Sequence, residues 1–175
     1  MRLSSGIVGA ALAIGAVLLD QLTKLKVREV LEIGRSVHVF GPVYLTHVEN
    51  TGSVFGIGQG YVIVPTIATI AILIAVPIIL WYLKSRHGYV PSTFESACAG
   101  LIIGGAIGNL IDRVGRAAVT DFVDVVILPG VHWPAFNVAD ACVVVGTIFL
   151  LVVFSMYSVH QSAHDVDSGS HGTQC

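Results

Sequence analysis

The sequence predicts an all-α polytopic membrane protein with four transmembrane helices and a small β-rich element. Of its 175 residues, 54% are hydrophobic and only 11% are charged, whereas a soluble domain carries about 25% charged residues. Four apolar segments are long enough to cross a bilayer, which takes about 20 helical residues. Because lipid offers the backbone no hydrogen bonds, such spans must be helical. The small net charge of −2 argues against a broad nucleic-acid surface.

The predicted spans are about Ser4 to Leu22, Val62 to Leu83, about Phe94 to Ile111, and about Phe136 to Tyr157. The first segment could instead be a secretory signal peptide, because Arg2 precedes an apolar stretch with small residues. We favour a retained helix, since the stretch continues into Asp20-Gln-Leu-Thr-Lys24 without a clear cleavage site. Asp20 and Lys24 lie one helical turn apart, a spacing that suits an ion pair.

Two segments between the spans have the composition of β-strands. Residues 37–48 are β-branched and aromatic with a break at Gly41-Pro42, which predicts one or two short strands. Residues 119–128 predict another strand, ended by Pro129-Gly130. Residues 84–93 form a short polar turn between the second and third spans.

The chain divides into one membrane domain, residues 1–158, and a tail, residues 159–175. The tail is rich in His, Ser, Asp and Gly, a composition typical of disorder. Its three histidines, His160, His164 and His171, could bind a metal, but we favour a solvated tail.

The charge count does not settle the orientation in the membrane. Four spans place both termini and the 84–93 turn on one side, with Arg2, Lys84 and Arg86. The two larger loops, 23–61 and 112–135, carry more cations: Lys24, Lys26, Arg28, Arg35, Arg113 and Arg116. The positive-inside rule therefore points to termini outside the cell. That count loses weight if Lys24 and Arg113 are held by functional contacts.

The third predicted span has a small-residue face that ends in a polar cluster. Gly100, Gly104 and Gly108 recur every four residues, which predicts a close helix–helix contact. Asn109, Asp112 and Arg113 follow. Arg113 could pair with Asp112 or with a loop carboxylate, and we favour a structural clamp over direct chemistry.

Asp140 opens the apolar fourth span, where a charge costs at least ~2.5–3.5 kcal/mol and usually marks function. It shares a helix face with Asn137. An equally good interpretation makes Asn137 the N-cap of the helix and Asp140 an acid in its first turn. Asp121 and Asp124 would lie on opposite faces of a strand, and only one could face Asp140. The spacing does not choose between them.

The loop before the second span contains Asn50-Thr-Gly-Ser-Val-Phe-Gly. Its glycines predict a turn or a close backbone approach. Ser53 is not a predicted nucleophile, because the string is not Gly-x-Ser-x-Gly.

Five strings together resemble the bacterial lipoprotein signal peptidases (signal peptidase II). They are Asp20-Gln-Leu-Thr-Lys24, Asn50-Thr-Gly-Ser-Val-Phe55, Gly104-Gly-Ala-Ile-Gly-Asn-Leu-Ile-Asp-Arg113, Val119-Thr-Asp-Phe122 and Phe136-Asn-Val-Ala-Asp140. They occur in family order over residues 10–157. The chain departs from the family where Ser53-Val54 replaces small alanines.

The resemblance implies an aspartic endopeptidase whose catalytic residues are Asp121 and Asp140. It also implies that a further set shapes the site or contacts substrate: Asp20, Lys24, Asn50, Gly52, Asn109, Arg113 and Asn137. The implied substrate is a diacylglyceryl-modified prolipoprotein, cut just before its lipidated cysteine, without a metal or other cofactor.

The implied location is the bacterial cytoplasmic (inner) membrane, in contact with its lipid and without nucleic acid. Both termini are then cytoplasmic, and the active site and the extracytoplasmic β-rich element lie at the outer face. We expect a monomer. The alternative is a small proton-coupled transporter or channel subunit, since intramembrane aspartates also build proton relays.

Overall fold

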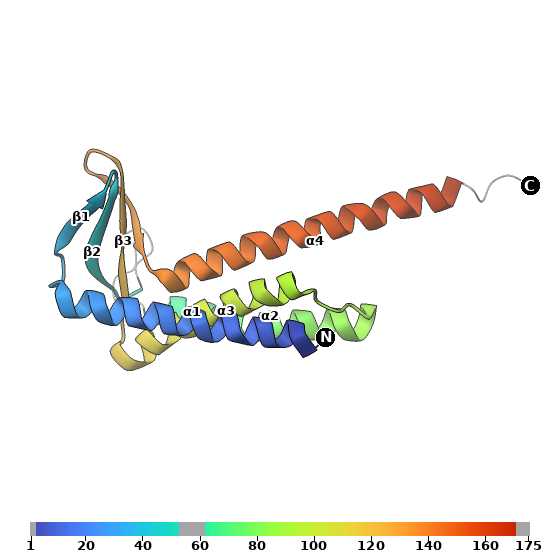
Figure 1. The fold of residues 1–175 in the computed structure, drawn as a ribbon, viewed down its shortest axis with the longest axis horizontal. Coiled ribbons are helices and arrows are strands. Elements are labelled where there is room, and N and C mark those ends of the chain that lie inside the picture. The colour runs from blue at the N-terminus through green and yellow to red at the C-terminus, as the bar shows by residue number, and fades with distance from the viewer. Residues whose placement is uncertain (1–2, 53–61, 171–175) are drawn as a thin grey trace, which may run out of the picture.

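The structure, a computed structural model, describes residues 3–52 and 62–170. Its elements are α1 (Leu3–Val30), β1 (Ser36–Phe40), β2 (Val43–Asn50), α2 (Ile63–His87), α3 (Thr93–Arg116), β3 (Val119–Leu128), β4 (Val131–Phe136) and α4 (Val138–Ser170). The helices lie along the long axis of the molecule, and the strands stand at one end of them (Figure 1). The start of α1 and the end of α4 lie toward the other end.

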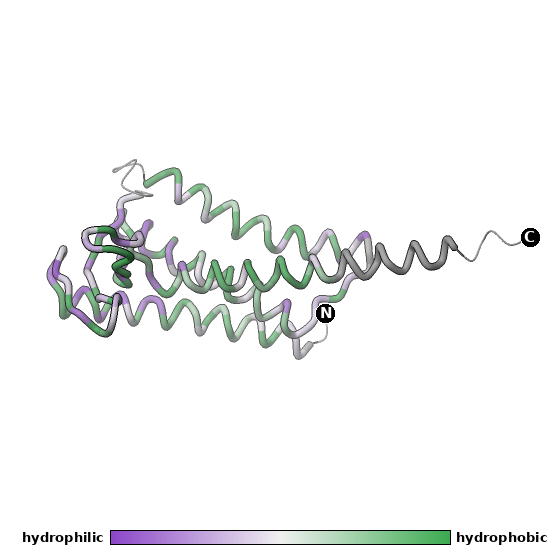
Figure 2. Tube along the Cα trace, turned by 90° about the horizontal axis from the view of Figure 1, so that it is seen from above, coloured by the Kyte–Doolittle hydropathy of each residue, from purple (hydrophilic) through white to green (hydrophobic). Residues whose placement is uncertain are grey.

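Among the described residues, four helices are long and apolar enough to cross a membrane: Ser4–Val30, Ile63–Arg86, Thr93–Arg116 and Val138–Met156. Each overlaps a predicted span, so the predicted fold class is confirmed. Apolar residues fill most of the helical length, and hydrophilic residues are frequent at the sheet end (Figure 2). Helix α1 continues past the predicted end at Leu22, because the protein itself provides partners for the polar residues of its last turns.

Helix α3 is the most buried of the four spans. In its most apolar stretch 61% of residues are buried, against 6–11% in the other three. Its glycine face turns toward α1: a Cβ at Gly104 would lie 2.5 Å from the carbonyl oxygen of Ala13, and one at Gly108 would lie 2.5 Å from Oδ2 of Asp20. Gly100 approaches the carbonyl oxygen of Gly9 in the same way. The predicted close helix–helix contact is confirmed.

Helix α3 has well-defined ends. At its start the Ser92 hydroxyl accepts from the Glu95 amide while the Glu95 carboxylate accepts from the Ser92 amide, the reciprocal arrangement of a capping box. At its end Ala117 adopts a left-handed conformation, with φ of 56°, which stops the helix. The chain then turns directly into β3, so the polar cluster at the end of α3 lies beside that strand.

The strands form one antiparallel sheet in the order β1-β2-β3-β4. The predicted strands at 37–48 and 119–128 are confirmed, and the predicted break at Gly41-Pro42 is the turn between β1 and β2. Strand β4 is missing from the sequence prediction, which begins the fourth span at Phe136. It pairs with β3 through Trp133 and Val125. Its Pro134 lies on the sheet edge, where a missing amide donor is tolerated.

Helix α4 continues to Ser170, so residues 159–170 are helical where the sequence predicted a disordered tail. No Gly or Pro occurs between Gly146 and Gly169, and these are the two residue types that most disfavour a helix. His171 lies outside the described residues. The division into a 1–158 domain and a separate tail stays a prediction.

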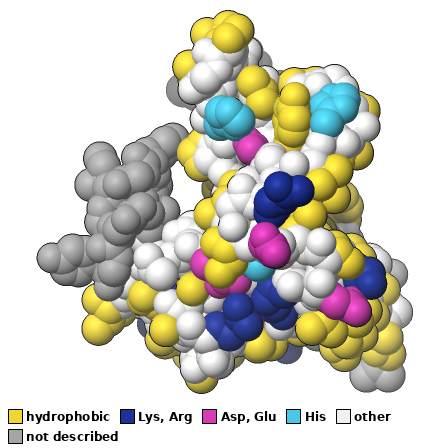
Figure 3. All heavy atoms as spheres, turned by 90° about the vertical axis from the view of Figure 1, so that its left-hand side faces the viewer, with side chains coloured by type: hydrophobic (Ala, Val, Ile, Leu, Met, Phe, Trp, Pro, Cys, Tyr) yellow, Lys and Arg dark blue, Asp and Glu magenta, His cyan; other side chains and the backbone are white. Residues whose placement is uncertain are grey.

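The surface at the sheet end mixes charged, histidine and apolar side chains (Figure 3). Lys26 and Glu29 form an ion pair of 2.9 Å, with side chains 68% and 66% exposed. Such exposed pairs contribute only about 0–1 kcal/mol. The charges that shape the site are therefore the buried ones.

Candidate active site

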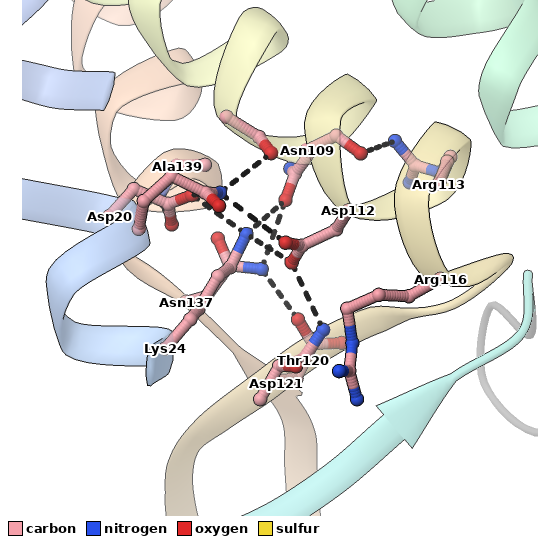
Figure 4. Close-up of polar contacts among 12 residues, drawn as sticks. Asp20, Lys24, Asn109, Asp112, Arg113, Arg116, Thr120, Asp121, Asn137 and Ala139 are labelled. Atoms are coloured by element: carbon pink, nitrogen blue, oxygen red, sulfur yellow. Dashed lines mark hydrogen bonds and ion pairs between the residues drawn. The ribbon is translucent and has the colours of Figure 1, made fainter. Parts of the chain in front are cut away.

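A group of polar side chains, buried or nearly so, lies where the helices meet the sheet (Figure 4). Its buried members come from α1, α3, β3 and the start of α4: Asp20, Lys24, Asn109, Asp112, Thr120, Asp121 and Asn137. Asn50 at the end of β2 and Asp140 in the first turn of α4 are partly exposed and bond to this group. Most of the predicted site residues therefore meet in one place.

The ammonium group of Lys24 joins three acceptors. Its Nζ lies 2.8 Å from Oδ2 of Asp20 and 3.0 Å from Oδ2 of Asp112, and it donates to Oδ1 of Asn109 at 3.0 Å. The side chains of Lys24 and Asp20 are fully buried. The predicted Asp20–Lys24 ion pair is confirmed, and α1 is an integral part of the site, as expected for a retained helix.

Lys24 also sets the direction of two side-chain amides. An ammonium group can only donate, so the oxygen of Asn109 faces Lys24 and its Nδ2 donates to Oδ1 of Asp140 at 2.8 Å. The Nδ2 of Asn137 donates to Oδ1 of Asn109 at 3.1 Å and to Oδ1 of Asp121 at 2.6 Å. Asp121 and Asp140 therefore both accept from side-chain amides whose orientation is fixed by Lys24.

Asp140 is both a helix-capping residue and a member of this group. The backbone amide of Asn137 donates to Oδ2 of Asp140, and the amide of Asp140 donates to Oδ1 of Asn137 at 2.9 Å. This is the N-cap arrangement that the spacing allowed. It also directs Oδ1 of Asp140 toward Asn109, so the capping and functional interpretations describe the same geometry.

The two aspartates of β3 have different surroundings. Asp121 is 2% exposed and accepts from Asn50 at 2.9 Å and from Asn137 at 2.6 Å. Burial and the nearby charge of Asp140 raise the pKa of Asp121 to about 7, against the lowering effect of these hydrogen bonds. Asp124 instead bonds to Thr46 at 2.9 Å and His132 at 2.8 Å. Of the two, Asp121 is the one that lies with Asp140.

Arg113 makes neither of the two carboxylate contacts that its sequence position allowed. No carboxylate lies within 4 Å of its guanidinium in the part of the chain that the structure describes. Its Nη1 donates to the Thr69 hydroxyl of α2 at 3.0 Å and to the carbonyl oxygen of Asn109 at 3.4 Å. Asp112 forms an ion pair with Lys24 instead, because the glycine face of α3 allows α1 to approach closely. Arg113 thus connects α2 to the end of α3.

The predicted turn after β2 is confirmed at Gly52. Its φ is 104°, a value that disfavours other residues, and its amide donates to Oδ1 of Asn50 at 3.0 Å. This bond leaves Nδ2 of Asn50 directed at Asp121. Ser53 lies outside the described residues.

Comparison with known proteins identifies the family. A family model described as signal peptidase (SPase) II matches residues 12–156, which include every residue of the buried group. The chain belongs to the signal peptidase II family. It is therefore a multi-pass membrane peptidase, and the family is one of aspartic proteases.

Individual relatives agree with the family match. A lipoprotein signal peptidase of Halothermothrix orenii is 40% identical over 140 residues, covering 78% of this chain and 87% of that protein. Another, from Halalkalibacterium halodurans, is 42% identical over 146 residues, with coverage of 81% and 88%. A bacterial membrane enzyme solved by the in meso method has a TM-score of 0.73 at 30% identity, covering 90% of this chain and 92% of that one. Nothing in these comparisons supports the transporter or channel alternative.

Sequence reasoning missed a second layer of polar residues in this signal peptidase II fold. Gln21 donates to the Gly108 carbonyl at 3.1 Å and to Asp112 at 3.3 Å. Arg28 donates to Thr120 at 3.0 Å, and Thr120 donates to Glu49 at 3.1 Å. Arg28 follows Lys24 by one helical turn, and this spacing was the available signal. The Glu49–Thr120 contact depends on the pairing of β2 with β3, which one sequence does not reveal.

Proposed function

We propose that the protein removes signal peptides from diacylglyceryl-modified prolipoproteins, cutting before the lipidated cysteine, with Asp121 and Asp140 as the catalytic acid–base pair. One observation carries the assignment of the pair. The two carboxyl groups come from different elements, both bond to Asn137, and neither has a cationic partner within 4 Å among the described residues. Carboxyl groups placed in this way share a proton, because both cannot ionise cheaply.

In the first step, the Asp140 carboxylate takes a proton from a water molecule as its oxygen attacks the scissile carbonyl carbon. The protonated Asp121 gives its proton to the carbonyl oxygen, which produces a neutral tetrahedral diol. Burial and the nearby charge of Asp140 raise the pKa of Asp121 to about 7, so the pair holds a shared proton near neutral pH. Asp140 is also the more exposed of the two, which leaves it accessible to water and substrate.

In the second step the roles reverse, as general acid–base catalysis requires. Asp140 gives its proton to the amide nitrogen, Asp121 takes one from a hydroxyl of the diol, and the C–N bond breaks. The products are the carboxyl end of the signal peptide and the free amine of the lipidated cysteine. The pair then again holds one proton, and it titrates as a unit.

The other predicted site residues support this pair. Asn109 and Asn137 hold the carboxyl groups, Lys24 and Asp20 fix those amides, and Gly52 directs Asn50 at Asp121. Arg113 holds α2 beside the site through Thr69. We infer that it also bounds the entry path of the substrate between α2 and α3.

The proposed orientation has both termini in the cytoplasm and the sheet at the outer face. The charge count opposes this orientation, but it includes Lys24, which is fully buried in an ion pair and unavailable to the membrane surface. We further propose that a single copy of the chain is active, since all the proposed site residues come from one chain.

The test is cleavage of a lipidated prolipoprotein by the purified protein in detergent with added lipid. Asp121→Asn and Asp140→Asn should each lower kcat by about 10²–10⁴-fold, the usual contribution of a general acid or base. The matched control is Asp124→Asn, three residues from Asp121 on the same strand, which should keep near-normal activity. Full activity in either dyad variant would refute the assignment.

A further inference from the structure

A cavity lies at the end of the bundle away from the sheet. It has a volume of about 420 Å³ and lies between the first turns of α1, the last turns of α2 and the first turns of α3. Small-molecule sites span roughly 300–1,000 Å³, so its size suits a ligand. None of the proposed catalytic or site-shaping residues lines it.

The walls of this cavity are mostly apolar. On one side α1 contributes Gly9, Ala10 and Ala13, and the backbone at Gly9 is so near α3 that a Cβ there would lie 2.6 Å from the carbonyl oxygen of Ser96. On the other side α2 contributes Trp81, which is 68% exposed. The slot between them suits a flexible hydrocarbon chain better than a rigid or polar molecule.

Two polar groups give the cavity a direction. Ser96 lines the cavity and is only 7% exposed, and its buried hydroxyl oxygen has no hydrogen-bond partner among the described residues. A buried hydroxyl without a partner is destabilising. Lys84 also lines the cavity, is exposed, and has no carboxylate within 4 Å in the described part of the chain. No acidic side chain among the described residues lines it.

We propose that this cavity binds one anionic phospholipid. Its acyl chain occupies the slot among the small residues of α1, its ester oxygen accepts from the Ser96 hydroxyl, and its phosphate lies against Lys84. A basic side chain at the end of a membrane helix selects anionic headgroups. The lipid would connect α2 to the α1–α3 pair, where α2 needs such support because only 6% of its most apolar stretch is buried in the protein.

Trp81 provides a built-in reporter, because the chain has only one other tryptophan, Trp133, which lies in β4 of the sheet. The full chain carrying Trp133→Phe is reconstituted in phosphatidylcholine vesicles. These contain dibrominated phosphatidylglycerol or, in parallel, dibrominated phosphatidylcholine at the same mole fraction. Bromine quenches tryptophan fluorescence on contact. Brominated phosphatidylglycerol should quench Trp81 at a mole fraction about fivefold lower than brominated phosphatidylcholine does. This is the effect of one cation near the membrane surface on the binding of an anionic lipid.

Paired variants identify the contacts. Lys84→Gln should abolish the preference for phosphatidylglycerol, whereas Arg86→Gln, on the same helix but outside the cavity, should keep it. Ala10→Leu fills the slot and should weaken quenching by both lipids, whereas its neighbour Ala11→Leu should not. Both alanines are exposed, so these changes spare the core.

Ser96→Ala tests whether the cavity binds a ligand or is only a packing defect. In lipid-free detergent this variant should be at least as heat-stable as the wild type, because it removes the unpartnered hydroxyl. With phosphatidylglycerol added, the wild type should gain more stability than the variant, as expected when a ligand binds only the folded state.

Three results would overturn the proposal: equal quenching of the wild type by the two lipids, a preference that survives Lys84→Gln, or equal stabilisation of the wild type and Ser96→Ala by phosphatidylglycerol. A prolipoprotein that displaces brominated lipid from Trp81 when unlabelled phosphatidylglycerol does not would also overturn it, and would assign the cavity to the substrate.

Discussion

Two pairs of aspartates lie side by side in this protein, and they differ in whether a cation contacts them. Asp20 and Asp112 share one buried cation, with Lys24 Nζ at 2.8 Å and 3.0 Å. Asp121 and Asp140 receive amide donors instead, and no cation lies within 4 Å of them among the described residues. Arg28 Nη1 also lies 3.7 Å from Oδ1 of Asp112, so two cations face the two carboxylates of the first pair. The second pair is hydrogen-bonded and makes no direct ion pair within the described residues.

This difference assigns a structural role to Asp20 and Asp112 and a catalytic role to Asp121 and Asp140. A buried ion pair is costly to break, because the remaining charge is left without compensation. A buried carboxyl group without a counter-ion has a raised pKa, as Asp121 does, and can move a proton near neutral pH. Asn109 connects the two pairs, since it accepts from Lys24 and donates to Asp140.

The largest stability effect should come from removing the shared cation. Lys24→Met leaves Asp20 buried without a cation, and leaves Asp112 with only Arg28 at 3.7 Å, so it should lower the free energy of unfolding by about 3–5 kcal/mol. The measurement is thermal or denaturant unfolding in detergent. Lys26→Met breaks an exposed pair on the same helix and should cost at most about 1 kcal/mol. Equal losses in the two variants would mean that the buried cluster is not a stabilising element.

A smaller loss should follow from disturbing the contact that seats Asp20. A Cβ at Gly108 would lie 2.5 Å from Oδ2 of Asp20, so Gly108→Ala should destabilise the protein by about 1–3 kcal/mol, the usual cost of overpacking. Gly115 lies in the same helix with nothing within 4 Å of its Cβ position. Gly115→Ala should be neutral or stabilising by up to about 1 kcal/mol. A harmless Gly108→Ala would show that α1 and α3 can separate freely there.

The smallest effect should be a shift in the pH profile. Activity requires the proton on Asp121, so kcat/KM of the wild type should fall as the pH rises through about 7. The hydrogen bond from Asn50 favours the ionised form and lowers the pKa of Asp121. Asn50→Ala should therefore move this fall in kcat/KM to higher pH. The shift should be on the order of one pH unit, the effect of one hydrogen bond to a charged group.

Thr46→Ala is the control for this shift, because it removes a donor from Asp124 on the same pair of strands. Its profile should match that of the wild type. If the limb of Asn50→Ala moved to lower pH, Asp121 would not be the group that loses the proton.

The parts of the fold that follow from local patterns could be predicted from the sequence. Apolar runs located the four helices, and the β-branched run ended by Pro129-Gly130 located β3. A separation of four residues was enough to pair Asp20 with Lys24. Strand β4 was missed because its Pro134 argues against a strand, and only its position at the sheet edge makes that residue acceptable.

The parts that depend on long-range contacts could not be predicted. The sequence allowed Asp112 to pair with the adjacent Arg113, but the close approach of α1 brings Lys24 to Asp112. The spacing placed Asp121 and Asp124 on opposite faces without saying which face meets the helices. The family resemblance selected Asp121, and the structure now gives the physical difference: Asn137 bonds to Asp121, whereas His132 bonds to Asp124.

The most direct test of the proposed proton-sharing pair is infrared spectroscopy of the carboxyl groups across a pH titration. The wild type should contain a protonated carboxyl group at neutral pH that ionises with an apparent pKa of about 7. This signal should be absent from Asp121→Asn and unchanged in Asp124→Asn. A wild type with no carboxyl group titrating near neutral pH, or a signal that survives Asp121→Asn, would contradict the account.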